Sequence, residues 1–216
     1  GSIFLPVQGS ISSQVADLNN DGYMDLVFCP NASGIQHPRR SLTVFWGTPN
    51  GWSNAQSNRL LPVHNVKMIQ IADLNNDSWP DILTLNSRAW MPGQPGGHIL
   101  RIYWGGTYSF HLDRYTDIGL ESAAHILAVD INGDGIQDVV YANHTGNIKW
   151  LSGKEFVDFT DKFPASHEPA GSSLDFPHGK ILDMKSWESE GETYAYMLTD
   201  QDKIVRGYFS SPTQWT

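Results

Sequence analysis

The sequence predicts an all-β protein, a β-propeller of four-stranded antiparallel blades, from three observations. Short apolar runs of about five to seven residues, bounded by Gly, Pro and Asn, occur throughout the chain. No stretch of eleven or more residues has helical periodicity. A similar acidic segment begins at Asp17, Asp73 and Asp130, so it recurs every 56 or 57 residues. Such a period is typical of repeat architectures, and four strands per repeat are typical of propeller blades.

The first repeat shows the expected order of strands, at residues 14–18, 24–29, 41–47 and 58–63. The acidic segment joins the first two strands. A pair of aromatic residues follows the third strand of each repeat, in FWGTPNGW, YWGGTYSF, KWLSGKEF and YFSSPTQW, which aligns Trp150 with Trp46 and Trp104. We therefore expect one domain of residues 1–216, with repeat units at 11–64, 65–122, 123–165 and 166–216.

The beginning of the chain resembles the fourth strand of a repeat. Leu5-Pro6-Val7 matches Leu61-Pro62-Val63, and each proline precedes the first Asp of an acidic segment by eleven residues. Residues 3–8 are thus expected to complete the last blade and close a ring of four, which would hide an exposed sheet edge. Two alternatives stay open: an arc of a larger propeller, and half of a ring that a second chain completes.

The acidic segments have the residue types of a calcium loop. Side-chain oxygens occur at positions 1, 3, 5 and 9, Gly at position 6 allows a sharp turn, and the carbonyl of position 7 is a further donor. The loops contain no Cys or His, which argues against zinc. We expect about three structural Ca²⁺ ions. The predicted ligands are Asp17, Asn19, Asp21, Tyr23 and Asp25; Asp73, Asn75, Asp77, Trp79 and Asp81; and Asp130, Asn132, Asp134, Ile136 and Asp138.

Two loops depart from this pattern. Ser78 replaces the Gly of position 6 in the second loop, where a positive φ would cost on the order of 1 kcal/mol. In the fourth repeat Asp183 stands at position 1, but Lys185 and Trp187 occupy positions 3 and 5. We expect the second loop to keep its ion and the fourth to hold none.

The segments DLNNDGYMDLVF and VFWGTPNGWS resemble the FG-GAP/VCBS repeat family, and the resemblance covers nearly the whole chain. Members of that family include integrin α-subunit propellers, fungal propeller lectins and many secreted bacterial proteins. The resemblance implies a β-propeller, calcium in the acidic loops and a secreted location, either extracellular or periplasmic, including the cell surface. It does not imply one function, because the members differ in what they bind. The blade number expected here is below the usual seven of the family.

A ligand is expected on the face opposite the acidic loops. The connections from second to third strands and from fourth strands to the next repeat are long, and long loops on a rigid scaffold often bind ligands. Their candidate ligand-binding residues are His37, Arg39, Arg88, Trp90, His98 and His144. The favoured function is a non-catalytic binding module for a carbohydrate or a protein. The alternatives are a polysaccharide lyase or hydrolase, and one half of a larger, homo-oligomeric propeller.

Composition excludes two other classes of partner. The net charge of −9 and the lack of a basic cluster argue against nucleic-acid binding. No apolar run approaches the roughly 18 residues of a membrane span. Cys29 is the only cysteine, so no intrachain disulfide can form.

Overall fold

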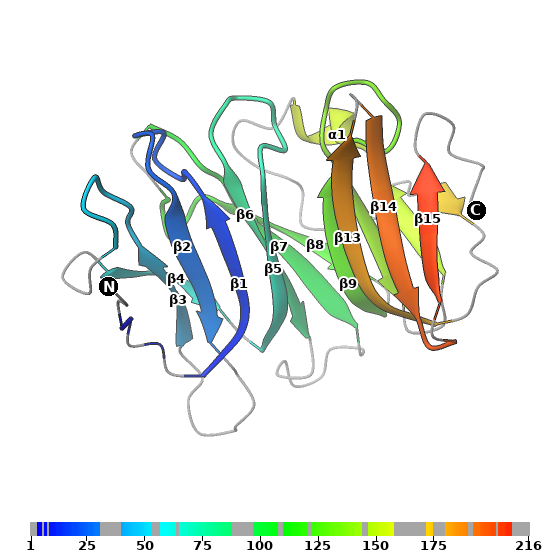
Figure 1. The fold of residues 1–216 in the computed structure, drawn as a ribbon, viewed down its shortest axis with the longest axis horizontal. Helices are drawn as coiled ribbons and strands as arrows, with labels where there is room; N and C mark the ends of the chain where they lie inside the picture. Colours follow the sequence, from blue (N-terminus) through cyan, green and yellow to red (C-terminus); the bar gives the residue numbers. More distant parts are fainter. Residues whose placement is uncertain are drawn as a thin grey trace. The chain divides into compact units, whose positions relative to one another are not determined.

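The computed structural model describes residues 4–5, 7, 9–30, 40–52, 57–63, 65–87, 97–107, 110–120, 122–143, 147–157, 172–174, 180–189, 192–201 and 203–208. These residues form four antiparallel sheets of three or four strands and one helical turn, which confirms the all-β class (Figure 1). The chain divides into two compact units, residues 1–73 with 77–119 and residues 74–76 with 120–216.

The first sheet of the first unit follows the predicted strand order. It contains β1 (Ser10–Ala16), β2 (Asp25–Pro30), β3 (Arg40–Phe45) and β4 (Ser57–Val63), each paired with the next. Buried and half-buried residues alternate along β2, as expected for a strand that faces the core on one side. Pro62 lies in the edge strand β4, where its missing N–H costs no ladder hydrogen bond.

The second sheet contains β5 (Val66–Ala72), β6 (Asp81–Ser87), β7 (His98–Tyr103) and β8 (Tyr115–Leu120), again in chain order. Strand β1 packs against β5, where Gln14 Nε2 donates to the Ile69 carbonyl at 3.3 Å. Tyr103 donates its hydroxyl to the Pro62 carbonyl and so joins β7 to β4. A continuous core runs through both sheets and includes Leu18, Val27, Leu42, Val44, Leu61, Ile69, Ile82 and Phe110.

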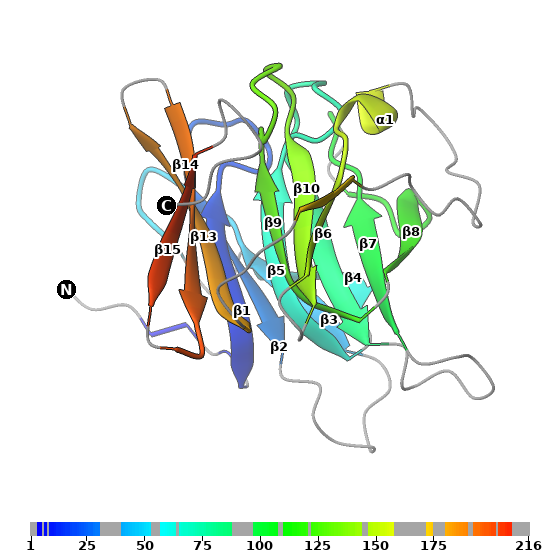
Figure 2. The ribbon, with the colours of Figure 1, turned by 90° about the vertical axis from the view of Figure 1, so that its right-hand side faces the viewer.

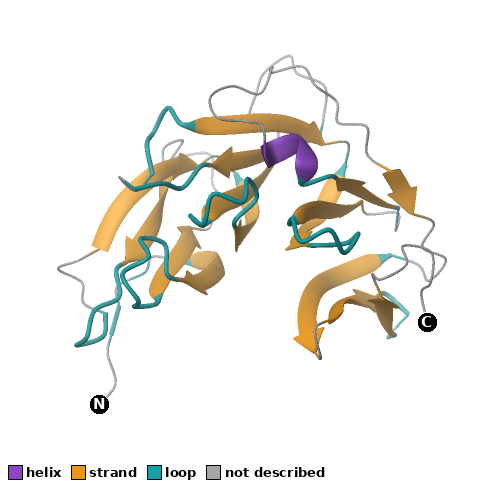
Figure 3. Cartoon of the chain, turned by 90° about the horizontal axis from the view of Figure 1, so that it is seen from above, coloured by secondary structure: helices purple, strands orange, loops and turns teal. Residues whose placement is uncertain are grey.

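The second unit also has two sheets. The third sheet contains β9 (Ala123–Val129), β10 (Asp138–Asn143), β11 (Ile148–Leu151) and β12 (Ser172–Leu174). The fourth contains β13 (Ile181–Ser189), β14 (Glu192–Thr199) and β15 (Ile204–Tyr208), side by side in Figure 2. The core of the second unit includes Leu127, Val129, Val140, Ile148, Met184 and Met197. The helical turn α1 (Lys154–Val157) follows β11 (Figure 3), and its Phe156 is buried.

Ring closure by the N-terminal segment is not found in the described residues. Phe4, Leu5 and Val7 lie outside any strand, and Phe4 is 87% exposed. The fourth sheet has three strands among the described residues. A three-residue motif match does not supply the cross-strand partners that a strand needs, so closure by residues 3–8 stays a prediction.

The third and fourth repeats also differ from the sequence alignment. Strand β12 lies beyond the expected boundary at residue 165. Leu151 pairs with Val139 just as Phe45 pairs with Leu26, so Ser152 stands where Trp46 stands in the first repeat. The expected alignment of Trp150 with Trp46 is therefore wrong by two residues.

The fourth repeat has a strand where a degenerate acidic loop was expected. Strand β13 continues through Asp183, Lys185 and Trp187 and pairs with β14 along its length. Neither Lys185 nor Trp187 thus belongs to a loop of the kind found in the other repeats.

Candidate metal-binding loops

The three acidic loops share one backbone conformation. They join β1 to β2, β5 to β6 and β9 to β10, and in each the residues at positions 4 and 6 have positive φ. These are Asn20 (54°) and Gly22 (86°), Asn76 (57°) and Ser78 (69°), and Gly133 (73°) and Gly135 (83°). Ser78 thus adopts the strained conformation that the sequence predicts for it. The repeated sequence produces a repeated shape, which is the first requirement for a repeated site.

The Asp at position 1 organises each loop by accepting backbone N–H groups. In the first loop Asp17 accepts from the amides of Asp21 at 3.0 Å and Gly22 at 2.8 Å. Asp73 accepts from Asp77 and Ser78 at 3.0 and 2.7 Å, and Asp130 accepts from Asp134 and Gly135 at 3.2 and 2.7 Å. The Asp at position 5 accepts from the amide of position 7 at 2.9 to 3.0 Å in all three loops.

The Asp at position 9 is buried and ties each loop to its third strand. Asp25 accepts from the amides of Leu18 at 2.8 Å and Gly47 at 2.7 Å, and Asp138 accepts from Ile131 at 3.0 Å and Gly153 at 2.7 Å. In the second loop Asp81 accepts from Gly105 at 2.8 Å. We call each buried carboxylate together with the glycine amide that it binds a carboxylate clasp.

Burial dominates the acidity of the clasp carboxylates. It raises the pKa of Asp138 to about 6, against the opposing effect of the Gly153 and Ile131 amides, and the charges of Asp134 and Asp130 raise it further. Burial likewise raises the pKa of Asp25, with Asp21 and Asp17 adding to the effect. The carboxylates of one loop therefore repel one another and would be stabilised by a nearby cation.

The clasps require glycine because the two backbones approach very closely. A Cβ on Gly47 would lie 2.4 Å from the Met24 carbonyl oxygen, one on Gly105 2.3 Å from that of Pro80, and one on Gly153 2.2 Å from that of Gln137. In each repeat the obstructing carbonyl is that of position 8, next to the clasp carboxylate. The sequence contained this signal as a glycine after each third strand, but its reason is visible only in the structure.

The loops fit a hard divalent cation by their donors. All their predicted ligands are oxygen atoms, which Ca²⁺ prefers. The geometry of the loops fits a metal ion less completely, because their carboxylates accept hydrogen bonds from backbone amides. Among the described residues no three His, Cys, Asp or Glu side chains converge as metal ligands would. An ionised carboxylate has about four acceptor sites, so a carboxylate that binds amides can also bind a metal ion.

A lysine lies against the third loop. Lys154 Nζ lies 3.0 Å from Asp134 Oδ2. Desolvation acts to raise the pKa of Asp134, but the ion pair with Lys154 and the hydrogen bonds from Ile136 and Asn132 together outweigh it, and the pKa is lowered. Asp134 Oδ2 is shielded from water and makes no aligned hydrogen bond within the described part of the chain. The ammonium group is therefore the principal partner of this oxygen.

Of the expected ligand-binding residues, only His98 is described. It begins β7 rather than lying in a loop, and its side chain is 9% exposed. Burial of this kind makes His98 a poor candidate for ligand contact. His37, Arg39, Arg88, Trp90 and His144 lie outside the described residues.

A small polar hollow lies on the face where a ligand was expected. It has a volume of about 160 Å³ at the connection between β10 and β11 and the start of β9, and its lining residues are Ser122, Tyr141, Asn143, Asn147 and Lys149. Sequence reasoning missed it, because it considered only His, Arg and Trp as candidates.

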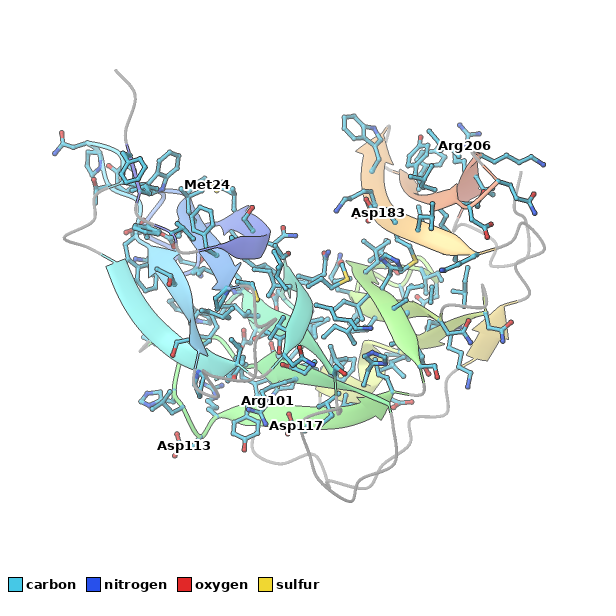
Figure 4. The ribbon with its side chains drawn as sticks, turned by 90° about the horizontal axis from the view of Figure 1, so that it is seen from below. Met24, Arg101, Asp113, Asp117, Asp183 and Arg206 are labelled. Carbon is cyan, nitrogen blue, oxygen red and sulfur yellow. The ribbon has the colours of Figure 1, made fainter. Side chains whose placement is uncertain are left out.

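An ion pair on the outer strands of the second sheet was also missed. Arg101 donates from Nε and Nη2 to the two carboxylate oxygens of Asp117 at 2.6 and 2.7 Å, and its guanidinium lies 4.0 Å from the centre of the Tyr115 ring (Figure 4). Residues sixteen positions apart reveal such a pair only once the strand register is known.

Comparison with known families supports the repeat assignment. The model of the FG-GAP-like repeat matches residues 17–84, which include the first two acidic loops and the first clasp. The expected resemblance to FG-GAP repeats is therefore confirmed over this segment. A comparison with curated proteins gave no match. No helix in the described part of the chain is both long and apolar enough to cross a membrane.

Proposed function

We propose that this chain is a calcium-stabilised, propeller-like binding module that works outside the cell and binds a carbohydrate or a protein. The observation that carries the proposal is the threefold repetition of one loop, with the same positive-φ positions and the same amide contacts. The FG-GAP-like match of residues 17–84 supports a propeller-like module. The four sheets are proposed to be its blades.

Calcium is proposed to bind inside each loop. In the first loop the ligands are the side chains of Asp17, Asn19, Asp21 and Asp25 and the carbonyl of Tyr23. The second and third loops use their equivalent residues. A bound Ca²⁺ would neutralise the mutual repulsion of the carboxylates, which adds to the larger effect of burial in raising the pKa of Asp138. The ions have a structural role, because they fix the turn between the first two strands of a repeat.

The ligand is proposed to bind on the opposite face, and the polar hollow of the third repeat supports a carbohydrate over an apolar ligand. An aromatic ring, two amides, a hydroxyl and an ammonium group line it. Hydrogen-bonding groups beside a ring are suited to sugar hydroxyls. A protein ligand would engage a wider part of this face.

Calcium titration tests the cation. The melting temperature should rise when CaCl₂ is added to EDTA-treated protein. Each site should raise the free energy of unfolding by about 2.7 kcal/mol when free calcium is a hundredfold above its dissociation constant. MgCl₂ is the control and should act more weakly, because Mg²⁺ dehydrates reluctantly and demands near-octahedral geometry. An unchanged melting temperature together with no heat of calcium binding would contradict the proposal.

A glycan array tests the ligand on the same protein, with calcium and with chelator. Binding is expected in calcium and should weaken in EDTA as the turns loosen. Asn147→Ala should reduce binding at the polar hollow, while Asp113→Asn, in the connection between β7 and β8, should not. Binding to no glycan would exclude the carbohydrate and leave a protein as the proposed ligand.

A further inference from the structure

We infer that Lys154 is a built-in cation of the third acidic loop, which makes that loop a weaker proposed calcium site than the first loop and less dependent on metal. This inference rests on the proposed function for its calcium part. It concerns a side chain that lies outside the acidic segment itself and follows β11. The contact between Lys154 Nζ and Asp134 Oδ2, at 3.0 Å, is its starting point.

The position of Lys154 is fixed from both sides. The preceding residue, Gly153, donates its amide to the clasp carboxylate of Asp138 at 2.7 Å. On the other side Phe156 is buried and its amide donates to the Gly153 carbonyl at 2.8 Å. The lysine therefore starts from a backbone held against the loop, so that pairing costs side-chain entropy but little further backbone entropy.

The equivalent positions of the other repeats carry no charge. The residue after the clasp glycine is Thr48 in the first repeat and Gly106 in the second. Thr48 is used differently, since its hydroxyl donates to the Gly51 carbonyl at 2.6 Å. The first and third loops are thus nearly identical in their own residues and differ in the cation supplied after the clasp glycine, whereas in the second repeat a Cβ on Gly106 would lie 2.6 Å from Arg114 Nη1.

Electrostatics gives the direction of the effect. Asp134 is only 18% exposed, whereas Lys154 is 67% exposed, so the pair is partly screened and stabilises the loop modestly. A divalent ion at the same carboxylate would meet the repulsion of a unit positive charge nearby, or would have to displace it. Either requirement lowers the calcium affinity of the third loop relative to the first.

Calorimetric titration with CaCl₂ of wild type and Lys154→Gln tests the inference, with Lys154→Arg as the control that keeps the charge. In wild type one site should bind about tenfold more weakly than the tightest, a difference of about 1.4 kcal/mol. Lys154→Gln should remove most of this difference, and Lys154→Arg should retain it. Adding Asn132→Ala to Lys154→Gln should abolish the gain, which assigns it to the third loop.

Melting in EDTA gives a second readout that needs no calcium. Lys154→Gln should melt about 2 °C below wild type, since its loop loses its cation, and Lys154→Arg should melt within about 1 °C of it. Equal calcium affinities and equal melting temperatures for wild type and Lys154→Gln would overturn the inference. If no variant bound calcium, the proposed function would fail, and the comparison in EDTA alone would decide whether Lys154 stabilises the loop.

Discussion

At the scale of single residues, the clasp glycines are tightly constrained. Each lies where a side chain would enter a neighbouring carbonyl group, and each amide is bound to a buried carboxylate. The glycines at position 6 are constrained differently, since open space surrounds them and only their φ is special. The two kinds of glycine should therefore respond differently to the same substitution.

Gly47→Ala is expected to lower the free energy of unfolding by about 2–3 kcal/mol, because its Cβ would lie 2.4 Å from the Met24 carbonyl oxygen and the backbones would have to separate. Gly22→Ala is the matched control in the same repeat. Its Cβ meets nothing within 4 Å, so only the strain of φ 86° remains, about 1 kcal/mol. Urea unfolding measures both values, and equal losses for the two variants would contradict the close approach.

Sequence reasoning identified the residues of the loops but not what most of them bind. Spacing alone predicted positive φ at Ser78, which the structure has. The partner of Asp25 is the amide of Gly47, on another strand, and no local pattern identifies a backbone donor. The sequence therefore predicted Asp25 only as a metal ligand and missed its role in holding the third strand.

At the scale of strands, the pairing of β7 with β8 depends on a side-chain contact as well as on the backbone. Arg101 and Asp117 are 17% and 32% exposed and form a two-pronged ion pair, with Tyr115 against the guanidinium. Burial acts to lower the pKa of Arg101, but Asp117 outweighs it and the pKa is raised. This pair lies at the outer edge of the second sheet, where β8 has no further neighbour among the described strands.

Asp117→Asn is expected to cost about 1.5 kcal/mol, because it leaves a half-buried guanidinium with weaker acceptors. Asp113→Asn, an exposed carboxylate close in sequence to β8, should change stability by less than about 0.5 kcal/mol. Chemical denaturation at low and high salt compares them, and the Asp117 effect should shrink at high salt. A similar loss of stability in both variants would show that the net charge of the protein, rather than the ion pair of Arg101 and Asp117, sets the stability.

Strand order was predictable in the first two repeats because apolar runs and turn residues are regular there. Strand alignment was less predictable in the third repeat, where matching aromatic residues paired Trp150 with Trp46 and Trp104. In the structure Leu151 pairs with Val139 and the Gly153 amide binds the Asp138 carboxylate, which leaves Trp150 two residues earlier than expected. A polar contact across strands thus overrode the similarity of the side chains.

At the scale of the whole molecule, ring closure by the N-terminal segment stays a prediction. Closure of a ring depends on contacts between the two ends of the chain, and a short motif such as Leu5-Pro6-Val7 carries no information about them. The described residues of this segment form no strand, and Phe4 is largely exposed.

Removal of residues 1–8 is expected to leave the melting temperature within about 1 °C of the full chain, because the described residues among them, Phe4, Leu5 and Val7, are exposed or half-buried and lie outside any strand. Differential scanning calorimetry measures this, with sedimentation used to compare the masses of the two proteins. A drop of several degrees, or a change of oligomeric state, would show that the segment does pair with a sheet and closes a ring.

The clasps have one more consequence, which concerns ancestry. Asp25 and Gly47, Asp81 and Gly105, and Asp138 and Gly153 each belong to a single repeat. A stretch of gene that encodes one repeat therefore encodes both the carboxylate and the glycine of its clasp whenever it is copied. A repeat can therefore be added by duplication without new polar contacts at its junctions. Side chains outside the clasp, such as Lys154, can then differ from one repeat to the next.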